Sequence, residues 1–337
     1  MSRSGPGRPR VGFIVGPTGA GKTALALGVA ERLGAEIVNA DSRQVYRGMD
    51  IGTAKPTRAE RRRVAHHLID IRTPAEPLDV ADFAHLARSS ISEIAARGRA
   101  VLVVGGSGLY LRAIRGGICA VPPASHELRQ RLGAMAEQHG VPAMHHRLSE
   151  VDPKLAARLA HNDLRRIIRG LEVFALTGIP LSEHQQRHRF AQRDFDVLTV
   201  GITLPRPRLY QAINQRFAAM VEAGLVDEVR ALLAAGYDPG APPLNTIGYR
   251  EIAGFVNGQL TIGDAILRAQ RESRRLAKRQ LTWFGADPEI VWLDADHAAE
   301  PAFAMFREFF QDQAERGGAE QSGAQTRDSS RGSHARE

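Results

Sequence analysis

The chain has 337 residues, which is long enough for a sizeable core and for two lobes. Apolar residues make up 43% of it and no apolar run approaches the length of a membrane span, so we expect a soluble protein that does not enter the membrane. Cys119 is the only cysteine, which excludes an intramolecular disulfide and favours a cytoplasmic location. The formal net charge of +8 favours a polyanionic partner such as nucleic acid, although an arginine-rich composition alone would also produce it.

A strand, a glycine-rich loop and a helix are predicted near the start of the chain. Residues 11–15 are apolar and rich in β-branched side chains, as in a buried strand, and residues 24–33 favour a helix that stops at Gly34. The loop between them, residues 16–23, is called the phosphate loop below and has the pattern G-x-x-x-x-G-K-T. Its residues are Gly16, Pro17, Thr18, Gly19, Ala20, Gly21, Lys22 and Thr23. In such a segment the loop amides and the helix N-terminus converge on a point that favours a phosphate or diphosphate.

Two side chains of this loop have predicted roles of their own. Lys22 is expected to contact phosphate oxygens as a point charge, and the Thr23 hydroxyl is placed for Mg²⁺ or for the phosphates themselves. The alternative is a glycine-rich turn that binds no ligand.

A second short strand is predicted over residues 37–40, and Asp41 follows it directly. In a doubly wound sheet this position lies beside the phosphate loop, at the edge where such folds bind ligands. A carboxylate there can hold a metal or act as a general base. The alternative is an aspartate that caps a helix or stabilises a turn. The neighbouring polar residues Ser42, Arg43 and Gln44 favour the functional interpretation.

The third buried strand, over residues 101–104, runs into Gly105, Gly106 and Ser107. A nucleoside triphosphatase usually has an aspartate here that holds Mg²⁺. The two glycines would instead allow the backbone to approach a ligand, or form a tight turn. The adjacent histidines at positions 66 and 67 face different ways and have no third ligand at a recognisable spacing, so a zinc site is not favoured.

The character of the sequence changes between residues 119 and 193, where apolar spacing becomes helical and arginine accumulates. Arg165, Arg166 and Arg169 lie within one helical turn, so at least two share a face. We interpret this stretch as a helical insertion with a basic surface. The alternative is an ordinary solvated face.

The rest of the chain returns to α/β character. A strand is predicted over residues 195–202, one long helix over 209–234, and a last core strand over 290–293. Another helix carries six basic residues between positions 268 and 279 against one acidic residue, with residues 271, 275 and 278 forming a cationic stripe.

The predicted fold is therefore α/β, with a P-loop NTPase-like parallel sheet flanked by helices and interrupted by a helical insertion domain. The discontinuous core comprises residues 11–118 and 195–312, and the insertion comprises residues 119–194. Residues 1–10 and 313–337 are expected to be disordered, because they contain almost no apolar side chains.

Eight ordered motifs resemble those of the tRNA dimethylallyltransferase family, also called tRNA isopentenyltransferases. They are GPTGAGKT, DSRQVY, MDIGTAKP, HHLID, GGSGLYLR, HNDLRRIIRGLEV, IGYREI and AKRQLTWF, and they span about residues 11–293. The resemblance implies transfer of a dimethylallyl group from dimethylallyl diphosphate to N6 of the tRNA adenosine immediately 3′ of the anticodon. It also implies Mg²⁺ as a cofactor and a monomeric enzyme.

The resemblance also implies roles for individual residues. The loop from Gly16 to Thr23 binds the diphosphate, with Lys22 and Thr23 as catalytic residues, and Arg216 lies near that diphosphate. Asp41 is the catalytic base. The expected tRNA contacts, which include the insertion motif, are Asp41, Ser42, Arg43, Gln44, Ser107, Arg165, Arg166 and Arg169.

The sequence departs from the family pattern in three motifs. Gly19 and Ala20 replace the usual Ala-Ser pair, which removes one hydroxyl, and Ser107 replaces a threonine. Asn245 and Thr246 precede Ile247 where the family has a glutamine before its Ala-Ile-Gly-Tyr-Lys segment. None of these changes removes Lys22 or Asp41.

Three other functions stay open at this point. A nucleotide or small-molecule kinase would use the same loop, and an adenylate isopentenyltransferase would share the loop but accept free nucleotides. The helical insertion and the basic helix argue against a free nucleotide as acceptor. A non-catalytic RNA-binding protein would use the loop only as a turn.

Overall fold

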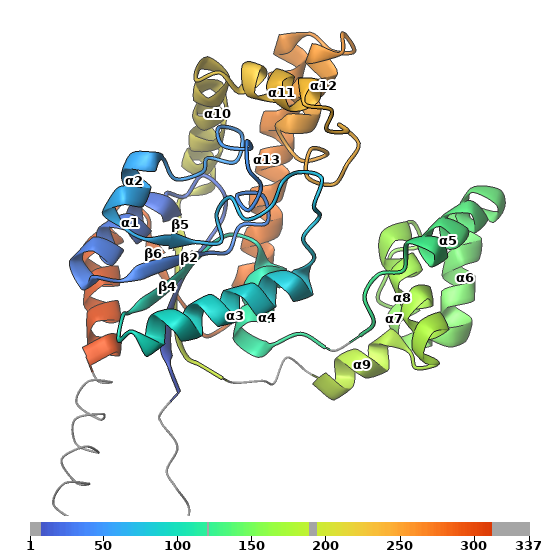
Figure 1. Ribbon diagram of the computed structural model, residues 1–337, viewed down its shortest axis with the longest axis horizontal. Coiled ribbons are helices and arrows are strands. Elements are labelled where there is room, and N and C mark those ends of the chain that lie inside the picture. The colour runs from blue at the N-terminus through green and yellow to red at the C-terminus, as the bar shows by residue number, and fades with distance from the viewer. Residues whose placement is uncertain (1–7, 120, 189–193, 312–337) are drawn as a thin grey trace, which may run out of the picture. The chain divides into compact units, whose positions relative to one another are not determined.

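The computed structural model describes residues 8–119, 121–188 and 194–311. The tail expected from residue 313 onward, and most of the disordered segment expected before residue 11, lie outside the described residues. The chain divides into two compact units, Met1–Arg115 with Asp194–Glu337 and Gly116–Arg193 (Figure 1).

The first unit is built on a six-stranded parallel sheet, which confirms the predicted fold class. The strand order is β3-β2-β4-β1-β5-β6. The strands are β1 (Arg10–Val15), β2 (Glu36–Asn39), β3 (His66–His67), β4 (Val101–Val104), β5 (Asp196–Thr203) and β6 (Ile290–Asp294). Parallel strands covered on both faces are apolar along their whole length rather than alternating, as β4 is with its four buried residues.

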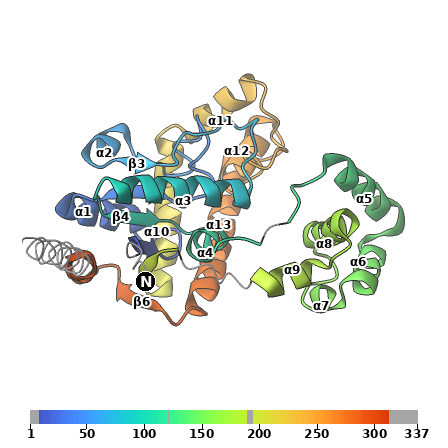
Figure 2. The ribbon, with the colours of Figure 1, turned by 60° about the horizontal axis from the view of Figure 1, so that its bottom comes forward.

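Helices cover both faces of this sheet. They are α1 (Lys22–Leu33), α2 (Arg58–Arg63), α3 (Val80–Ala96), α4 (Gly108–Gly116), α10 (Arg206–Glu222), α11 (Leu225–Ala234), α12 (Tyr249–Val256), α13 (Ile262–Gly285) and a last helix over residues 299–311. Phe13 of β1 packs in a core with side chains of α3 and α4, whereas the next residue, Ile14, packs with α1 and the last helix. Figure 2 shows α3 running along the sheet. Successive strand residues thus fill two separate cores.

The second unit contains only helices among its described residues. They are α5 (His126–His139), α6 (Val141–Val151), α7 (Pro153–Ala156), α8 (Leu164–Thr177) and α9 (Leu181–His188). Their shared core contains Met144, Leu148 and Ile167, which are almost completely buried. Because β5 of the sheet begins at Asp196, this helical unit interrupts the α/β unit in the chain.

Two sequence predictions about the α/β unit are wrong. The helix expected over residues 209–234 is two helices, because Gly224 adopts a left-handed φ of 101° and caps α11 separately. The strand expected to end the core is followed by the helix over residues 299–311, whose Phe306 is fully buried. Gly12 makes room for that ring, since a Cβ at position 12 would lie 2.7 Å from it.

Within the described residues, no helix is both long enough and apolar enough to cross a membrane.

Candidate active site

The phosphate loop joins β1 to α1 in the strand–loop–helix arrangement that its sequence predicts. Gly16 has a φ of 144°, and a Cβ on it would lie 2.3 Å from the carbonyl oxygen of Ile202, so a side chain has no room there. The helix begins at Lys22 and Gly21 supplies no side-chain cap, which leaves the first-turn amides available to an anion. The Lys22 ammonium turns back over the loop and donates to the Pro17 carbonyl at 2.8 Å.

A second cation reaches the loop from α10. The Arg216 guanidinium donates to the Thr18 hydroxyl at 2.6 Å. Burial, together with the nearby Arg216 charge, lowers the pKa of Lys22 to about 8, and Asp41 opposes this shift. Burial also lowers the pKa of Arg216, again with Asp41 opposing it. Two cations that repel one another beside the loop amides form a site that is stabilised by a bound polyanion.

Asp41 leaves the end of β2 within a locally fixed turn. Its Oδ1 accepts the backbone amide of Arg43 at 2.8 Å, and the Ser42 amide donates to the Ser107 hydroxyl at 3.3 Å. The Arg43 guanidinium donates to the Pro242 carbonyl at 2.9 Å. Asp41 therefore stabilises a turn, which was one of the alternatives left open by the sequence. The contact with the Arg43 amide uses only one of its two carboxylate oxygens.

One pocket joins the phosphate loop to Asp41. It is lined by Lys22, Thr23, Ala26, Ile37, Asn39, Asp41, Gln44, Pro56, His66, Val104, Gly105 and Gly106. The sheet order explains this convergence, because β4 lies between β1 and β2 and the carboxyl ends of all three meet at one edge. The structure thus brings together the predicted residues Lys22, Thr23, Asp41 and Gln44. The predicted Arg165, Arg166 and Arg169 belong to the helical unit instead.

The two glycines after β4 are needed for packing between protein segments. A Cβ on Gly105 would lie 2.2 Å from the Ala40 carbonyl oxygen, and one on Gly106 would lie 2.5 Å from the side-chain nitrogen of Gln280. Both glycines also line the pocket, so tight packing and ligand access coincide here. Glycines thus follow β4 at the position where nucleoside triphosphatases usually have a Mg²⁺-binding aspartate.

Gln280 of α13 is a site residue that sequence reasoning missed. Its Oε1 accepts the Thr18 amide of the phosphate loop at 2.8 Å, and its Nε2 donates to the Gly106 carbonyl at 2.9 Å. One side-chain amide thereby ties the phosphate loop to the turn after β4. Its place in the AKRQLTWF motif was the available signal, but nothing in the spacing indicated which neighbour it would meet.

The two loop residues that depart from the family pattern, Gly19 and Ala20, lie against apolar side chains. Ala20 is buried and belongs to an apolar cluster with Ile202, Leu209 and Ile213. A Cβ on Gly19 would also meet Ile213, at 2.8 Å. A hydroxyl at position 20 would thus enter an apolar contact between the loop and α10, and its absence leaves Lys22 and Thr23 in place.

The three arginines of α8 have different surroundings. Arg169 donates to the fully buried Glu172 at 2.5 Å and to the Pro122 carbonyl at 2.9 Å, and Arg129 binds the same carboxylate. Arg166 is exposed and pairs with Asp163 at 3.2 Å, and Arg165 is exposed. Arg169 is therefore committed to the internal structure of the helical unit, whereas the other two present charge to solvent.

The two adjacent histidines pair with protein groups. His67 Nε2 lies 2.7 Å from Glu36 Oε2, and His66 Nδ1 lies 2.8 Å from the Val64 carbonyl, to which it donates. Burial lowers the pKa of His66, which favours its neutral form.

Comparisons with known proteins agree on one family. The IPP transferase family model matches residues 44–287. A tRNA dimethylallyltransferase 1 from Pelobacter propionicus is 50% identical over 291 residues, covering 86% of this chain and 94% of that protein. A tRNA dimethylallyltransferase from Geobacter metallireducens is 48% identical and covers 85% of this chain and 93% of that protein.

Solved structures are similar over most of the chain. The tRNA isopentenylpyrophosphate transferase from Bacillus halodurans has a TM-score of 0.67 and 39% identity, and the match covers 91% of this chain and 99% of that one. A eukaryotic dimethylallyltransferase described as acting on tRNA has a TM-score of 0.76 and 26% identity, covering 90% and 80%. From the family model, the identities and the coverage, the chain belongs to the tRNA dimethylallyltransferase family of IPP transferases.

Proposed function

We propose that this protein transfers the dimethylallyl group of dimethylallyl diphosphate to N6 of the adenosine immediately 3′ of the anticodon in tRNA. The products are N6-isopentenyladenosine and diphosphate. The observation that carries the proposal is the shared pocket, in which the cationic phosphate loop and the Asp41 carboxylate line one space. A diphosphate leaving group and a proton-accepting carboxylate are the two chemical needs of this transfer.

The residues divide the reaction between them. The loop amides, Lys22 and Arg216 bind the diphosphate and stabilise the negative charge that grows on it as the C1–O bond breaks. The adenine N6 lone pair forms the new bond to C1, and Asp41 accepts the proton that N6 loses. Asp41 Oδ1 accepts the Arg43 amide, which restricts the orientation of the carboxylate. A target base must leave the anticodon-loop stack to enter such a pocket.

Mg²⁺ fits the donors present. Within the described residues no three His, Cys, Asp or Glu side chains gather as a metal cluster, so a dedicated protein cage is lacking. Mg²⁺ commonly binds one or two protein oxygens together with substrate phosphates, and the Thr23 hydroxyl at the start of α1 offers such an oxygen. The ion would neutralise diphosphate charge. We further propose a monomeric enzyme of the cytoplasm, consistent with the single cysteine.

RNA binding is assigned to two basic surfaces. On α8, Arg165 and Arg166 are exposed. On α13, Arg271 and Arg275 both pair with Glu272, which partly neutralises the predicted cationic stripe, while Lys278 and Arg279 are exposed. Arg274 binds Asn214 of α10 instead. Such exposed cations would contact the phosphate backbone of tRNA.

Dimethylallyl transfer to bulk tRNA, measured beside AMP, ADP and ATP as alternative acceptors, tests the proposed function. We expect label from dimethylallyl diphosphate to enter tRNA alone, at the adenosine 3′ of the anticodon. Label in free nucleotides would indicate an adenylate isopentenyltransferase. Phosphoryl transfer from ATP would indicate a kinase, and RNA binding without either reaction would indicate a non-catalytic protein.

The affinity for dimethylallyl diphosphate should fall as pH rises above about 8. The pKa of Lys22 is lowered to about 8 in the free site, so its positive charge is present below that pH and lost above it. The terminal phosphate of the ligand ionises at about pH 6 and contributes no change of its own above pH ~8. Calorimetric titration should show a decrease approaching about tenfold per pH unit. Lys22→Met should bind weakly at every pH, and an unchanged slope in this variant would assign the effect to another group.

Asp41→Asn keeps the side-chain shape but cannot accept a proton. We expect turnover to fall by about 10²–10⁴-fold, the usual scale for a missing general base, with little change in tRNA affinity. Single-turnover kinetics and filter binding separate the two effects. Normal turnover with weakened tRNA binding would make Asp41 an RNA contact and leave the reaction without this base.

Arg165→Ala/Arg166→Ala should weaken tRNA binding, most at low salt. Each lost phosphate contact should lower the slope of log affinity against log salt by about 0.7–0.9. Arg169 is left intact, because its removal would take one ion-pair partner from the buried Glu172 and would therefore test folding rather than RNA binding. The control is Arg230→Ala/Arg307→Ala, which removes two exposed arginines of the α/β unit. Equal slopes for the two double variants would show an effect of net charge alone.

A further inference from the structure

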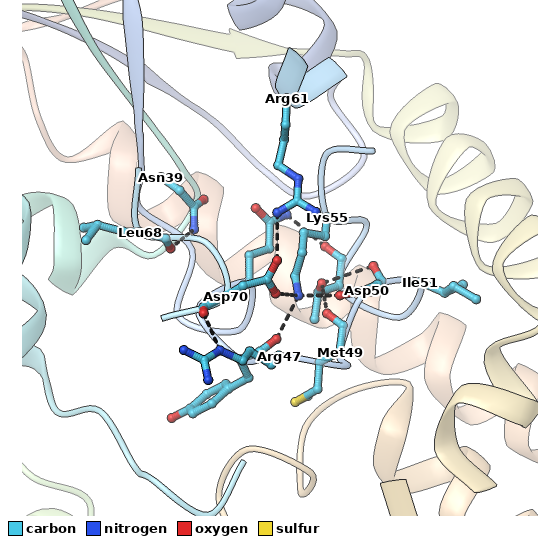
Figure 3. A network of polar contacts seen from close by, with 12 residues as sticks. Asn39, Arg47, Met49, Asp50, Ile51, Lys55, Arg61, Leu68 and Asp70 are labelled. Atoms are coloured by element: carbon cyan, nitrogen blue, oxygen red, sulfur yellow. Dashed lines mark hydrogen bonds and ion pairs between the residues drawn. The ribbon is translucent and has the colours of Figure 1, made fainter. Parts of the chain in front are cut away.

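A buried ammonium group contacts the chain just after the DSRQ segment, residues 41–44, which forms part of the pocket wall. Lys55 is 2% exposed at its side chain, and its Nζ donates to the Tyr46 carbonyl at 2.8 Å, to Asp50 Oδ1 at 2.5 Å and to Asp70 Oδ1 at 2.6 Å (Figure 3). The second oxygen of Asp70 accepts from Arg61 at 2.7 Å. One charge thus joins three stretches of chain that the motifs DSRQVY, MDIGTAKP and HHLID supply.

The choice of lysine here has a chemical reason. Only four of the 45 lysine and arginine residues are lysine, and they are Lys22, Lys55, Lys154 and Lys278. An ammonium group has three donors arranged around one atom, and Lys55 meets three acceptors. A planar guanidinium is larger and directs its donors in a flat fork, so arginine cannot reproduce this arrangement in the same space. Lys55 therefore differs in kind from the arginines that dominate the surface.

The backbone around Lys55 is strained. Ala54, Leu68 and Asp70 have φ values of 50°, 62° and 58°, and they are the non-glycine residues with positive φ in the described part of the chain. Such conformations are costly for residues with a Cβ and persist where the surroundings fix them. All three lie in the segments that the Lys55 network joins. The contacts of Lys55 therefore lie where these costly backbone conformations have to be held in place.

The strained segments carry the wall of the pocket. Gln44 Nε2 donates to the Thr53 and Ala54 carbonyls at 3.0 and 3.2 Å, and the Asp70 amide donates to the Gln44 carbonyl at 3.3 Å. Asn39 Nδ2 donates to the Leu68 carbonyl at 3.3 Å. Gln44 and Asn39 line the pocket on either side of Asp41 in the sequence. Displacing the segment around Lys55 would therefore move side chains that line the pocket.

A second anchor, on α11, holds the same segment. Glu228 of α11 accepts the backbone amides of Asp50, Ile51 and Gly52 at 2.9, 2.7 and 3.1 Å. The turn at residues 50–52 is thus already tied to the core without Lys55. What Lys55 adds is the tie from Asp50 to the Tyr46 carbonyl and to Asp70.

We propose that Lys55 is a positioning residue for the transfer reaction, whose ammonium group holds the pocket wall at Asn39, Asp41 and Gln44 in the geometry that receives the target adenosine. It touches neither substrate. This inference rests on the proposed function. It assigns Lys55 to the acceptor side of the site, which is the part that receives the tRNA adenosine. The phosphate loop is held independently of Lys55, by Gln280 and Arg216.

Steady-state kinetics of Lys55→Met and Lys55→Arg test this assignment. Methionine has a stem of similar length without the charge. We expect kcat/KM for tRNA to fall by about 10–100-fold in both variants, the scale of a site displaced by about 1 Å, while the dissociation constant of dimethylallyl diphosphate stays within about twofold. A purely structural role predicts instead that diphosphate binding and tRNA turnover fall together, in proportion to the folded fraction. That result would overturn the proposal.

Two further variants keep the test decisive. Asp50→Asn weakens one contact of Lys55 at a side chain that is 60% exposed, so folding should survive, and we expect a loss of about three- to tenfold in kcat/KM for tRNA. If Lys55→Met does not fold, unchanged kinetics in Asp50→Asn overturn the proposal. The control is Phe306→Leu, which destabilises the core at a position far from the Lys55 network in the sequence. It should keep the wild-type kcat/KM for tRNA per folded molecule.

The wild-type protein separates the two possible failures. If it transfers no dimethylallyl group to tRNA, the proposed function fails. If it is active and Lys55→Met retains kcat/KM for tRNA, the inference about Lys55 fails while the proposed function stands.

Discussion

The site depends on the adjacency of β1, β4 and β2 in one parallel sheet. Each strand ends in a different functional segment, namely the phosphate loop, the Gly105–Gly106 turn and Asp41. These segments can share one pocket only because the backbones pack without intervening side chains, as at Gly105 against Ala40. A Cβ at that position would separate the turn from the end of β2. The pocket is therefore a consequence of strand order and of glycine at the crossing points.

Charge is organised differently on the two sides of this pocket. On the phosphate side, Lys22 and Arg216 lie near one another and near Asp41, and burial disfavours their charged forms. This arrangement is poised for an anion rather than satisfied within the protein. On the acceptor side, Lys55 is fully paired, and the pKa of Asp70 is held low by Lys55 and Arg61 although burial opposes this. We therefore propose that the first set binds the diphosphate and that the second fixes the geometry of the pocket.

The same distinction separates the arginines of the helical unit. Glu172 is completely buried and would be costly without Arg129 and Arg169, which bind both of its oxygens. Burial acts to raise the pKa of Glu172, yet these contacts hold it below its usual value. Arg169 thus contributes first to the fold of this unit. A run of arginines in a sequence does not reveal which members are paired, because the partner can be a glutamate on the same helix or far along the chain.

Local patterns such as glycine spacing, β-branched runs and ordered motifs predict the phosphate loop, the buried strands, the helical interruption and the family. The place of Asp41 directly after a strand also indicates this residue. No such pattern predicts the break at Gly224, the buried helix after β6, the contacts of Gln280 or the partners of Lys55 and Arg169. These features depend on long-range packing, because the role of a donor is set by the acceptor that it meets in the folded chain. For Gln280 the acceptor lies 174 residues away in the chain, and no local pattern encodes that meeting.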